Sequence, residues 1–205
     1  MNHLAHVLVA GADEDMILGS WLGDFVHGNI DPDLRAGVRS GLALHRAVDV
    51  FTDRHPIVVS ARNVFQPPYR RYAGIILDIW FDHLLARDFR RWSRQPLEIY
   101  SQEARELLHR RSNLLPAALR RFLAYMQVHD LPFAYRDESQ IERVFAGVGS
   151  RLSRANPLAS SIAEIERLRP ELQAAFDAFF PDLIAFGEQF RNRCKQAARD
   201  QDRIA

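Results

Sequence analysis

A histidine and two aspartates recur at every fourth position in the stretch "LALHRAVDVFTD", residues 42–53. On a helix, residues four apart lie on one face, so His45, Asp49 and Asp53 would form one stripe with Arg46 beside the first of them. Two carboxylates at this spacing repel each other, which costs an isolated helix about 0.2–0.5 kcal/mol. A cation would offset that repulsion, so the stripe is a candidate cation site.

A second stretch combines acids and a histidine in the same way. The segment "GIILDIWFDHLLARDF", residues 74–89, is strongly apolar, yet it contains Asp78, Asp82 and His83. The two acids share a helix face by their spacing, and a helix that is apolar nearly all round should be buried. Because a buried ionised carboxylate needs a partner or a metal, this segment is a second candidate source of ligands.

Two shorter segments add further donor groups. "GSWLGDFVHGN" contains Asp24, and the start "MNHLAH" offers Asn2, His3 and His6. Imidazoles and carboxylates without thiolates favour Mn²⁺, Fe²⁺ or Mg²⁺-like octahedral chemistry, with zinc also possible. Such a metal would lower the pKa of a bound water and clamp phosphoryl oxygens, and Arg46 could neutralise charge that develops on the phosphoryl group.

Each of these residues also has a structural interpretation. A single helical histidine is more often packed or exposed than a ligand, and paired acids could cap helices or pair with the many arginines. Asp53 fits a helix-end role nearly as well, and His27 and His55 lie at predicted helix ends. The coincidence of acids and a histidine on two apolar helices keeps the metal-site interpretation open.

The elements that must position these residues are helices. Glycine and proline number 10 each and mostly punctuate the pattern, and alternating strand-like runs are absent. We predict a single all-α domain over the 205 residues, with the chemistry in residues 1–92 and helical scaffold in residues 93–205. The predicted helices cover residues 13–27, 34–54, 57–65, 70–92, 97–112, 117–130, 137–153, 158–179 and 182–200.

Composition excludes several classes of protein. The net charge of +1 argues against a strongly basic nucleic-acid binder. The single cysteine, Cys194, excludes an internal disulfide and suits a reducing compartment. No apolar run approaches the roughly 20 residues needed to span a bilayer, and the N-terminus has no basic leader. We therefore expect a cytoplasmic protein without a membrane or nucleic-acid partner; its oligomeric state is left open.

Four motifs, in this order and spacing, resemble the acyl carrier protein phosphodiesterase family, also called acyl carrier protein hydrolyase: "MNHLAH", "GDFVHGN", "LHRAVDVFTD" and "LDIWFDHLLARDF". The resemblance implies an all-helical fold that is a distorted version of the HD phosphohydrolase fold. It implies hydrolysis of the phosphodiester between 4′-phosphopantetheine and a serine of acyl carrier protein, giving apo-acyl carrier protein and 4′-phosphopantetheine. It also implies Mn²⁺ as the preferred metal.

The resemblance carries site roles onto matching positions. His6 would be a ligand or a proton donor supported by Asn2, Arg46 would hold a non-bridging oxygen, and His45 or His83 would protonate the leaving oxygen if it were not a ligand. True HD enzymes use consecutive His and Asp, whereas the nearest pair here is the inverted Asp82–His83, so individual ligands stay open. The implied metal and water-activating set is Asp24, His45, Asp49, Asp78, Asp82 and His83.

An acidic carrier protein would require a basic surface beside the site. Arginines flank the second apolar stretch on both sides, in "YRRYAG" and "ARDFRRWSR". The arginines that could form this surface are Arg70, Arg71, Arg87, Arg90, Arg91 and Arg94. The predicted substrate-binding residues are these arginines without Arg94, together with Asn2 and Arg46. Two other functions remain open: an HD-type phosphohydrolase of a nucleotide or small phosphate ester, and a catalytically silent helical binding module in which the acids pair with arginines.

Overall fold

The computed structural model describes residues 3–202, with side chains described for residues 3–200. Within these residues the chain forms α-helices joined by turns and short 3₁₀ helices, and it contains no strand, which confirms the all-α prediction. The α-helices are α1 (His3–Ala10), α2 (Glu14–Leu22), α3 (Ala36–Arg54), α4 (Pro56–Asn63), α5 (Ala73–Arg87), α6 (Leu97–Arg110), α7 (Ala117–Val128), α8 (Glu138–Arg151) and α9 (Ser161–Asp202). The 3₁₀ helices are η1 (Tyr69–Tyr72), η2 (Phe89–Arg91), η3 (Ser112–Leu114), η4 (Phe133–Arg136) and η5 (Leu158–Ser160).

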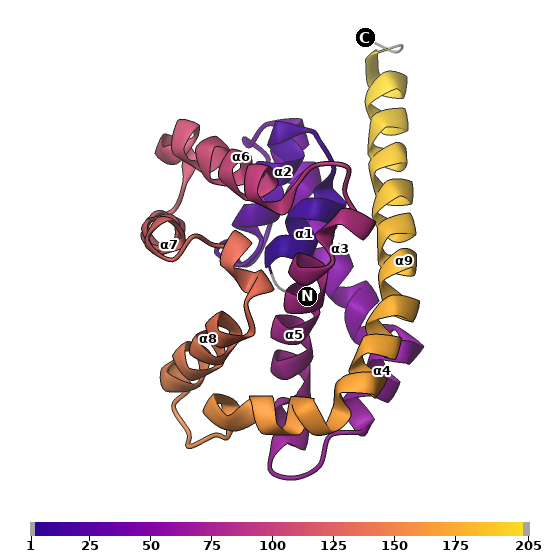
Figure 1. The fold of residues 1–205 in the computed structure, drawn as a ribbon. Helices are drawn as coiled ribbons and strands as arrows, with labels where there is room; N and C mark the ends of the chain where they lie inside the picture. The colour runs from indigo at the N-terminus through magenta and orange to yellow at the C-terminus, as the bar shows by residue number, and fades with distance from the viewer. Residues whose placement is uncertain (1–2, 203–205) are drawn as a thin grey trace.

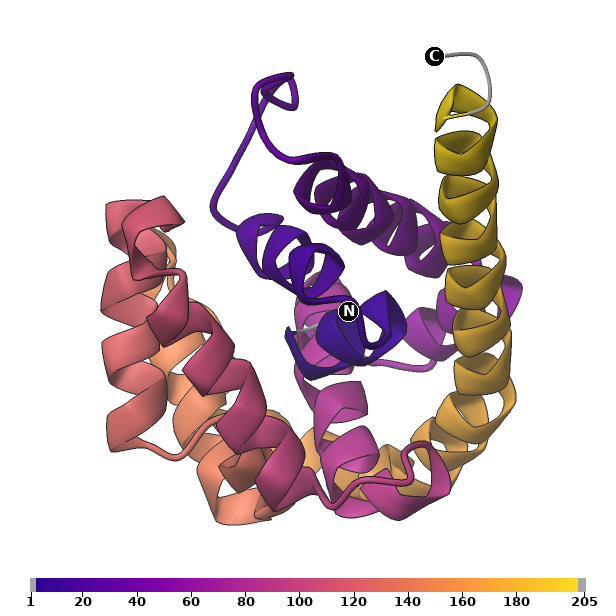
Figure 2. The same cartoon turned by 90° about the horizontal axis from the view of Figure 1, so that it is seen from above.

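The short helix α1 lies at the centre of the molecule, between α2, α3, α5 and α9 (Figures 1 and 2). The first helix predicted from the sequence begins only at residue 13, so α1 was missed. Eight residues are too few for a stable isolated helix, and α1 is stabilised by the burial of six of them. The backbone amides of Leu4 and Ala5 both donate to the buried carboxylate of Asp82 on α5, at 2.8 and 3.1 Å.

Helices α2 and α3 pack backbone against backbone because glycines face each other at the contact. A Cβ atom on Gly19 would lie 2.1 Å from the carbonyl oxygen of Val38, and one on Gly41 would lie 2.1 Å from that of Met16. No side chain fits in that space. This close approach brings the end of α2 and the loop after it against the middle of α3.

Helix α9 crosses two prolines without ending, although the sequence predicts two helices separated near Pro181. Pro170 and Pro181 both lie inside the helix. Each proline removes one backbone hydrogen bond, which favours a bend, but buried residues such as Phe176, Phe180 and Leu183 hold the helix against the core on both sides of the second proline. Figure 1 shows α9 running along the base of the molecule and then turning upward.

The remaining helices comprise one buried central helix, α5, and an outer group that surrounds the core. Helix α5 is central, with 11 of its 15 residues buried, as the apolar sequence predicts. Seen from above, α6, α7 and α8 lie on one side of α1–α3 and the long part of α9 lies on the other (Figure 2). In the part of the chain that the structure describes, no helix is both long and apolar enough to cross a membrane.

Candidate active site

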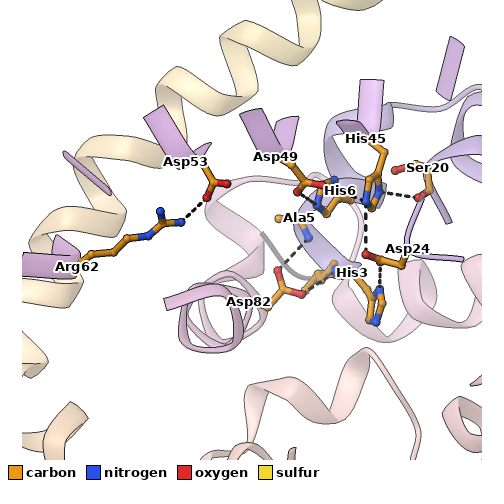
Figure 3. Close-up of polar contacts among 11 residues, drawn as sticks. His3, Ala5, His6, Ser20, Asp24, His45, Asp49, Asp53, Arg62 and Asp82 are labelled. Carbon is orange, nitrogen blue, oxygen red and sulfur yellow. Dashed lines mark hydrogen bonds and ion pairs between the residues drawn. The ribbon is translucent and has the colours of Figure 1, made fainter. Parts of the chain in front are cut away.

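Four of the predicted site residues meet at the junction of α1, α2 and α3 (Figure 3). His6 comes from α1, Asp24 follows the end of α2, and His45 and Asp49 lie one turn apart on α3. His45 Nε2 is 3.5 Å from Asp24 Oδ1 and 3.5 Å from Asp49 Oδ2, and His6 Nε2 is 3.1 Å from Asp49 Oδ1. Three segments that are separate in the sequence thus form one histidine–aspartate cluster.

A third histidine extends this cluster. His3 Nδ1 lies 2.9 Å from Asp24 Oδ2, and its ring packs against Trp21 and Phe122. The sequence offers His3 as a possible donor group, but its motif gives this residue no specific role. The available signal was the three-residue spacing from His6, which places both imidazoles on one side of a helix.

A hydrogen bond to a backbone carbonyl group sets the orientation of the His45 ring. Its Nδ1 lies 2.8 Å from the carbonyl oxygen of Ser20, which can only accept a hydrogen bond, so Nδ1 carries a proton. Its Nε2 therefore points at the two aspartates. Gly23 makes room for the ring, since a Cβ there would lie 2.1 Å from His45 Cγ. Nothing in the sequence marks Ser20 or Gly23 as a supporting residue.

The electrostatics of the cluster favour a neutral His6 imidazole and ionised carboxylates at Asp24 and Asp49. Burial lowers the pKa of His6 to about 4, against a smaller opposing effect of its hydrogen bond with Asp49. Burial alone would raise the pKa of Asp24, yet its close contacts with the imidazoles of His3 and His45 hold that pKa well below its usual range. Burial would also raise the pKa of Asp49, but the hydrogen bond with His6 lowers it. The net effect is a pKa below the ordinary value for this carboxyl group. These are the protonation states that metal ligation requires.

The donor set fits a divalent cation. His6, His45 and Asp49 each offer one ligand atom, and these atoms all lie within 4.8 Å of one another. Asp24 adds a carboxylate oxygen 3.5 Å from His45 Nε2. Mixed nitrogen and oxygen ligands suit Mn²⁺, Fe²⁺ or Zn²⁺.

A surface cavity of about 350 Å³ opens onto the cluster. Asp24 and Asp49 have 41% and 46% of their side chains exposed, whereas the His45 side chain is only 3% exposed. The carboxylates are thus open to solvent above a buried imidazole. Arg46 donates to the Val26 carbonyl at 3.1 Å and so holds the loop on one wall. The cavity is lined by Gly23, Asp24, Val26, His27, Gly28, His45, Arg46 and Asp49.

Other predicted site residues have different surroundings. Asp82 is fully buried beneath α1, where burial raises its pKa to about 7 despite the two backbone hydrogen bonds that it accepts. His83 contacts the Tyr135 carbonyl through Nδ1, at 2.9 Å, and its ring packs on Trp80. The structure therefore does not bring Asp82 or His83 into the cluster formed by His6, Asp24, His45 and Asp49.

Three further residues that the sequence offered as site residues lie outside this cluster or outside the described residues. Asp78 is half-buried on α5, one turn before Asp82, and its ligand role stays a prediction. Asp53 does not extend the α3 stripe into the cluster, since it forms an ion pair with Arg62 on α4 (Figure 3). Asn2 lies outside the described residues.

The predicted basic patch is divided by α5. Arg70 and Arg71 precede this 15-residue helix and the other arginines follow or end it, so the two groups are separated by roughly 22 Å of helix. Arg87 pairs with Asp88, and Arg91 pairs with Asp177 at 2.8 Å. The arginines that follow α5 are therefore partly neutralised within the protein.

The fold and the site define an all-helical protein that carries a histidine–aspartate cluster at the floor of an open cavity. The chain belongs to the acyl carrier protein phosphodiesterase family, whose sequence profile matches residues 1–183. Proteins named acyl carrier protein phosphodiesterase from Photorhabdus laumondii and Serratia proteamaculans are 32% and 34% identical to it, over 92% and 90% of this chain and 96% of each relative. One from Escherichia coli K12 is 34% identical over 90% of this chain and 96% of the relative. No solved structure matches, so the HD-like description of the fold stays a prediction.

Proposed function

We propose that this chain is a metal-dependent phosphodiesterase that hydrolyses the phosphodiester between 4′-phosphopantetheine and serine in holo-acyl carrier protein. The products would be apo-acyl carrier protein and 4′-phosphopantetheine. Family membership and the names of the relatives support the substrate. The environment of one side chain, His45, supports the metal.

His45 Nε2 faces two carboxylate oxygens while its Nδ1 proton is engaged by the Ser20 carbonyl. In the neutral tautomer that this hydrogen bond selects, Nε2 presents a lone pair to Asp24 and Asp49. Three electron-rich atoms then face one another, which is unfavourable unless a cation lies among them. A cation bound by imidazole Nε2, with Nδ1 donating to a backbone carbonyl, is a recurrent arrangement at metal sites.

His6, His45 and Asp49 would hold the metal, with Asp24 as a further ligand, and Mn²⁺ is the ion that we propose. When bound, the cation would supply Lewis-acid stabilisation of the phosphodiester oxygens and lower the pKa of a water molecule. Arg46 lies on the cavity wall with its guanidinium held by Val26, and we assign it to a non-bridging oxygen of the diester. His3 holds Asp24 through its hydrogen bond and so orients this carboxylate.

The test is a mass measurement on holo-acyl carrier protein incubated with the enzyme, with Mn²⁺ or with EDTA. Loss of the mass of phosphopantetheine with Mn²⁺ alone is the expected result. Asp49→Asn should abolish the reaction, whereas Asp53→Asn, one turn further along α3 and paired with Arg62, is the matched control and should retain it.

Two outcomes would contradict the proposal in different ways. If Mn²⁺ binds but the carrier protein keeps its mass, the substrate is wrong and a small phosphate ester becomes the better candidate. If no metal binds and the carrier protein is still cleaved, the metal assignment is wrong and His45 acts as an imidazolium between the two aspartates.

The carrier protein would be recruited by arginines on both sides of α5. Arg71 and Arg90 are exposed, one near each end of the helix. Recruitment of an acidic partner through such charges weakens with ionic strength, so KM for the carrier protein should rise with salt and on Arg71→Ala or Arg90→Ala, while kcat stays near the wild-type value.

A further inference from the structure

A second cavity, of about 630 Å³, lies beside the site between α3, α4 and α9. Arg46 belongs to the linings of both cavities. From Arg46 the second cavity extends along α3 past residues that recur at helical spacing. The two cavities are therefore neighbours along this helix. Its lining residues are Arg46, Ala47, Val50, Phe51, Arg54, His55, Pro56 and Phe186.

The walls of this cavity are mostly apolar. The rings of Phe51 and Phe186 stack with centroids 4.4 Å apart, and Val50 leaves 50% of its surface exposed. Exposed apolar surface in a hollow adjoining a polar site is typical of a pocket for the apolar part of a ligand. Its volume lies in the range of sites for small ligands.

One polar atom in the lining is left without a partner. His55 Nε2 lies 3.3 Å from Asp182 on α9, but its buried Nδ1 makes no hydrogen bond within the described residues. A buried polar atom without a partner is unfavourable, so a ligand that supplied one would be stabilised there. The pocket thus combines an apolar wall, two arginines and one available hydrogen-bonding position.

We propose that this cavity binds the pantetheine arm of the substrate, an inference that rests on the proposed function. A phosphodiester at Asp49 and Arg46 has two substituents, and only one of them is small enough to enter a pocket of this size. The arm carries a geminal dimethyl group and methylene groups, which match Val50 and Phe186, and amides, one of which would pair with His55. The folded carrier protein stays outside.

The experiment measures binding of the product 4′-phosphopantetheine and of inorganic phosphate to the Mn²⁺-loaded protein by calorimetry. Val50→Asn should weaken binding of 4′-phosphopantetheine by about tenfold and leave the affinity for phosphate unchanged. Val59→Asn is the matched control, because Val59 on α4 is 43% exposed and does not line the cavity. Both valines are exposed, so both variants should unfold at the wild-type temperature.

The arm assignment is overturned if Val50→Asn binds 4′-phosphopantetheine as tightly as the wild type does, or if the wild type binds it no more tightly than phosphate. If the wild-type enzyme still cleaves holo-acyl carrier protein, either result overturns only the arm assignment and the proposed function is retained. Absence of cleavage by the wild-type enzyme overturns the proposed function instead.

Discussion

The imidazole rings of His6 and His45 lie stacked, with centroids 3.8 Å apart and planes inclined by 13°, although they come from different helices. Both rings direct Nε2 at the same carboxylate, that of Asp49. Two imidazolium ions at this separation would repel each other, and burial keeps His6 neutral at pH 7. The stack therefore presents two nitrogen atoms and a carboxylate to one point.

Replacing Gly23 by alanine should damage the site more than the fold. The new methyl group would occupy the space of the His45 ring and force it to move. We expect Mn²⁺ affinity, measured by calorimetry, to fall at least about tenfold. Gly147→Ala on α8 is the control, because its Cβ would meet nothing within 4 Å; it should bind Mn²⁺ normally and gain up to about 1 kcal/mol in free energy of unfolding.

His3→Phe isolates the hydrogen bond to Asp24 from the packing of the ring. Phenylalanine can keep the contacts with Trp21 and Phe122 but cannot bond the carboxylate. We predict a decrease of about 10–100-fold in kcat or in metal affinity, with an unchanged unfolding temperature. Wild-type turnover by His3→Phe would show that Asp24 needs no support from His3.

Asp82 is expected to stabilise α1 rather than to bind metal. Asp82→Ala would leave the amides of Leu4 and Ala5 without their acceptor, at a cost of about 1–3 kcal/mol each when buried. Urea denaturation should show that loss, and Asp82→Asn, which keeps an acceptor oxygen, should recover part of it. The opposite pattern, with normal stability and lost Mn²⁺ binding, would return Asp82 to the ligand set.

The titration of His83 should make stability depend on pH. Burial lowers the pKa of His83 below its ordinary value of 6.5, against the opposing hydrogen bond to the Tyr135 carbonyl. The unfolded chain therefore takes up this proton first, and the stability contributed by neutral His83 is lost as pH falls from about 6.5 through the folded pKa. Compared with His83→Gln, the wild type should lose more free energy of unfolding between pH 7.5 and pH 5.5; equal losses would contradict the assignment.

Much of the fold follows from sequence pattern because helical periodicity is local. The apolar character of residues 74–89 predicted a buried central helix, and α5 is one. Helix α1 was missed because eight residues with no cap signal look like an apolar end, and only burial makes them a helix. The unbroken path of α9 through Pro181 was missed because apolar packing on both sides outweighs a local rule.

The sequence by itself determined which chemistry was available: imidazoles and carboxylates at helical spacing, without thiolates, in residues 1–92. Only the tertiary structure decided which of them meet. His6, Asp24, His45 and Asp49 converge because glycines allow α2 and α3 to touch and because α1 packs beside them. Asp82 and His83 have the same donor groups, yet the direction in which α5 presents them assigns one to the α1 amides and the other to the Tyr135 carbonyl. Spacing along one helix sets which side chains share a face, whereas the packing of several helices sets what that face meets.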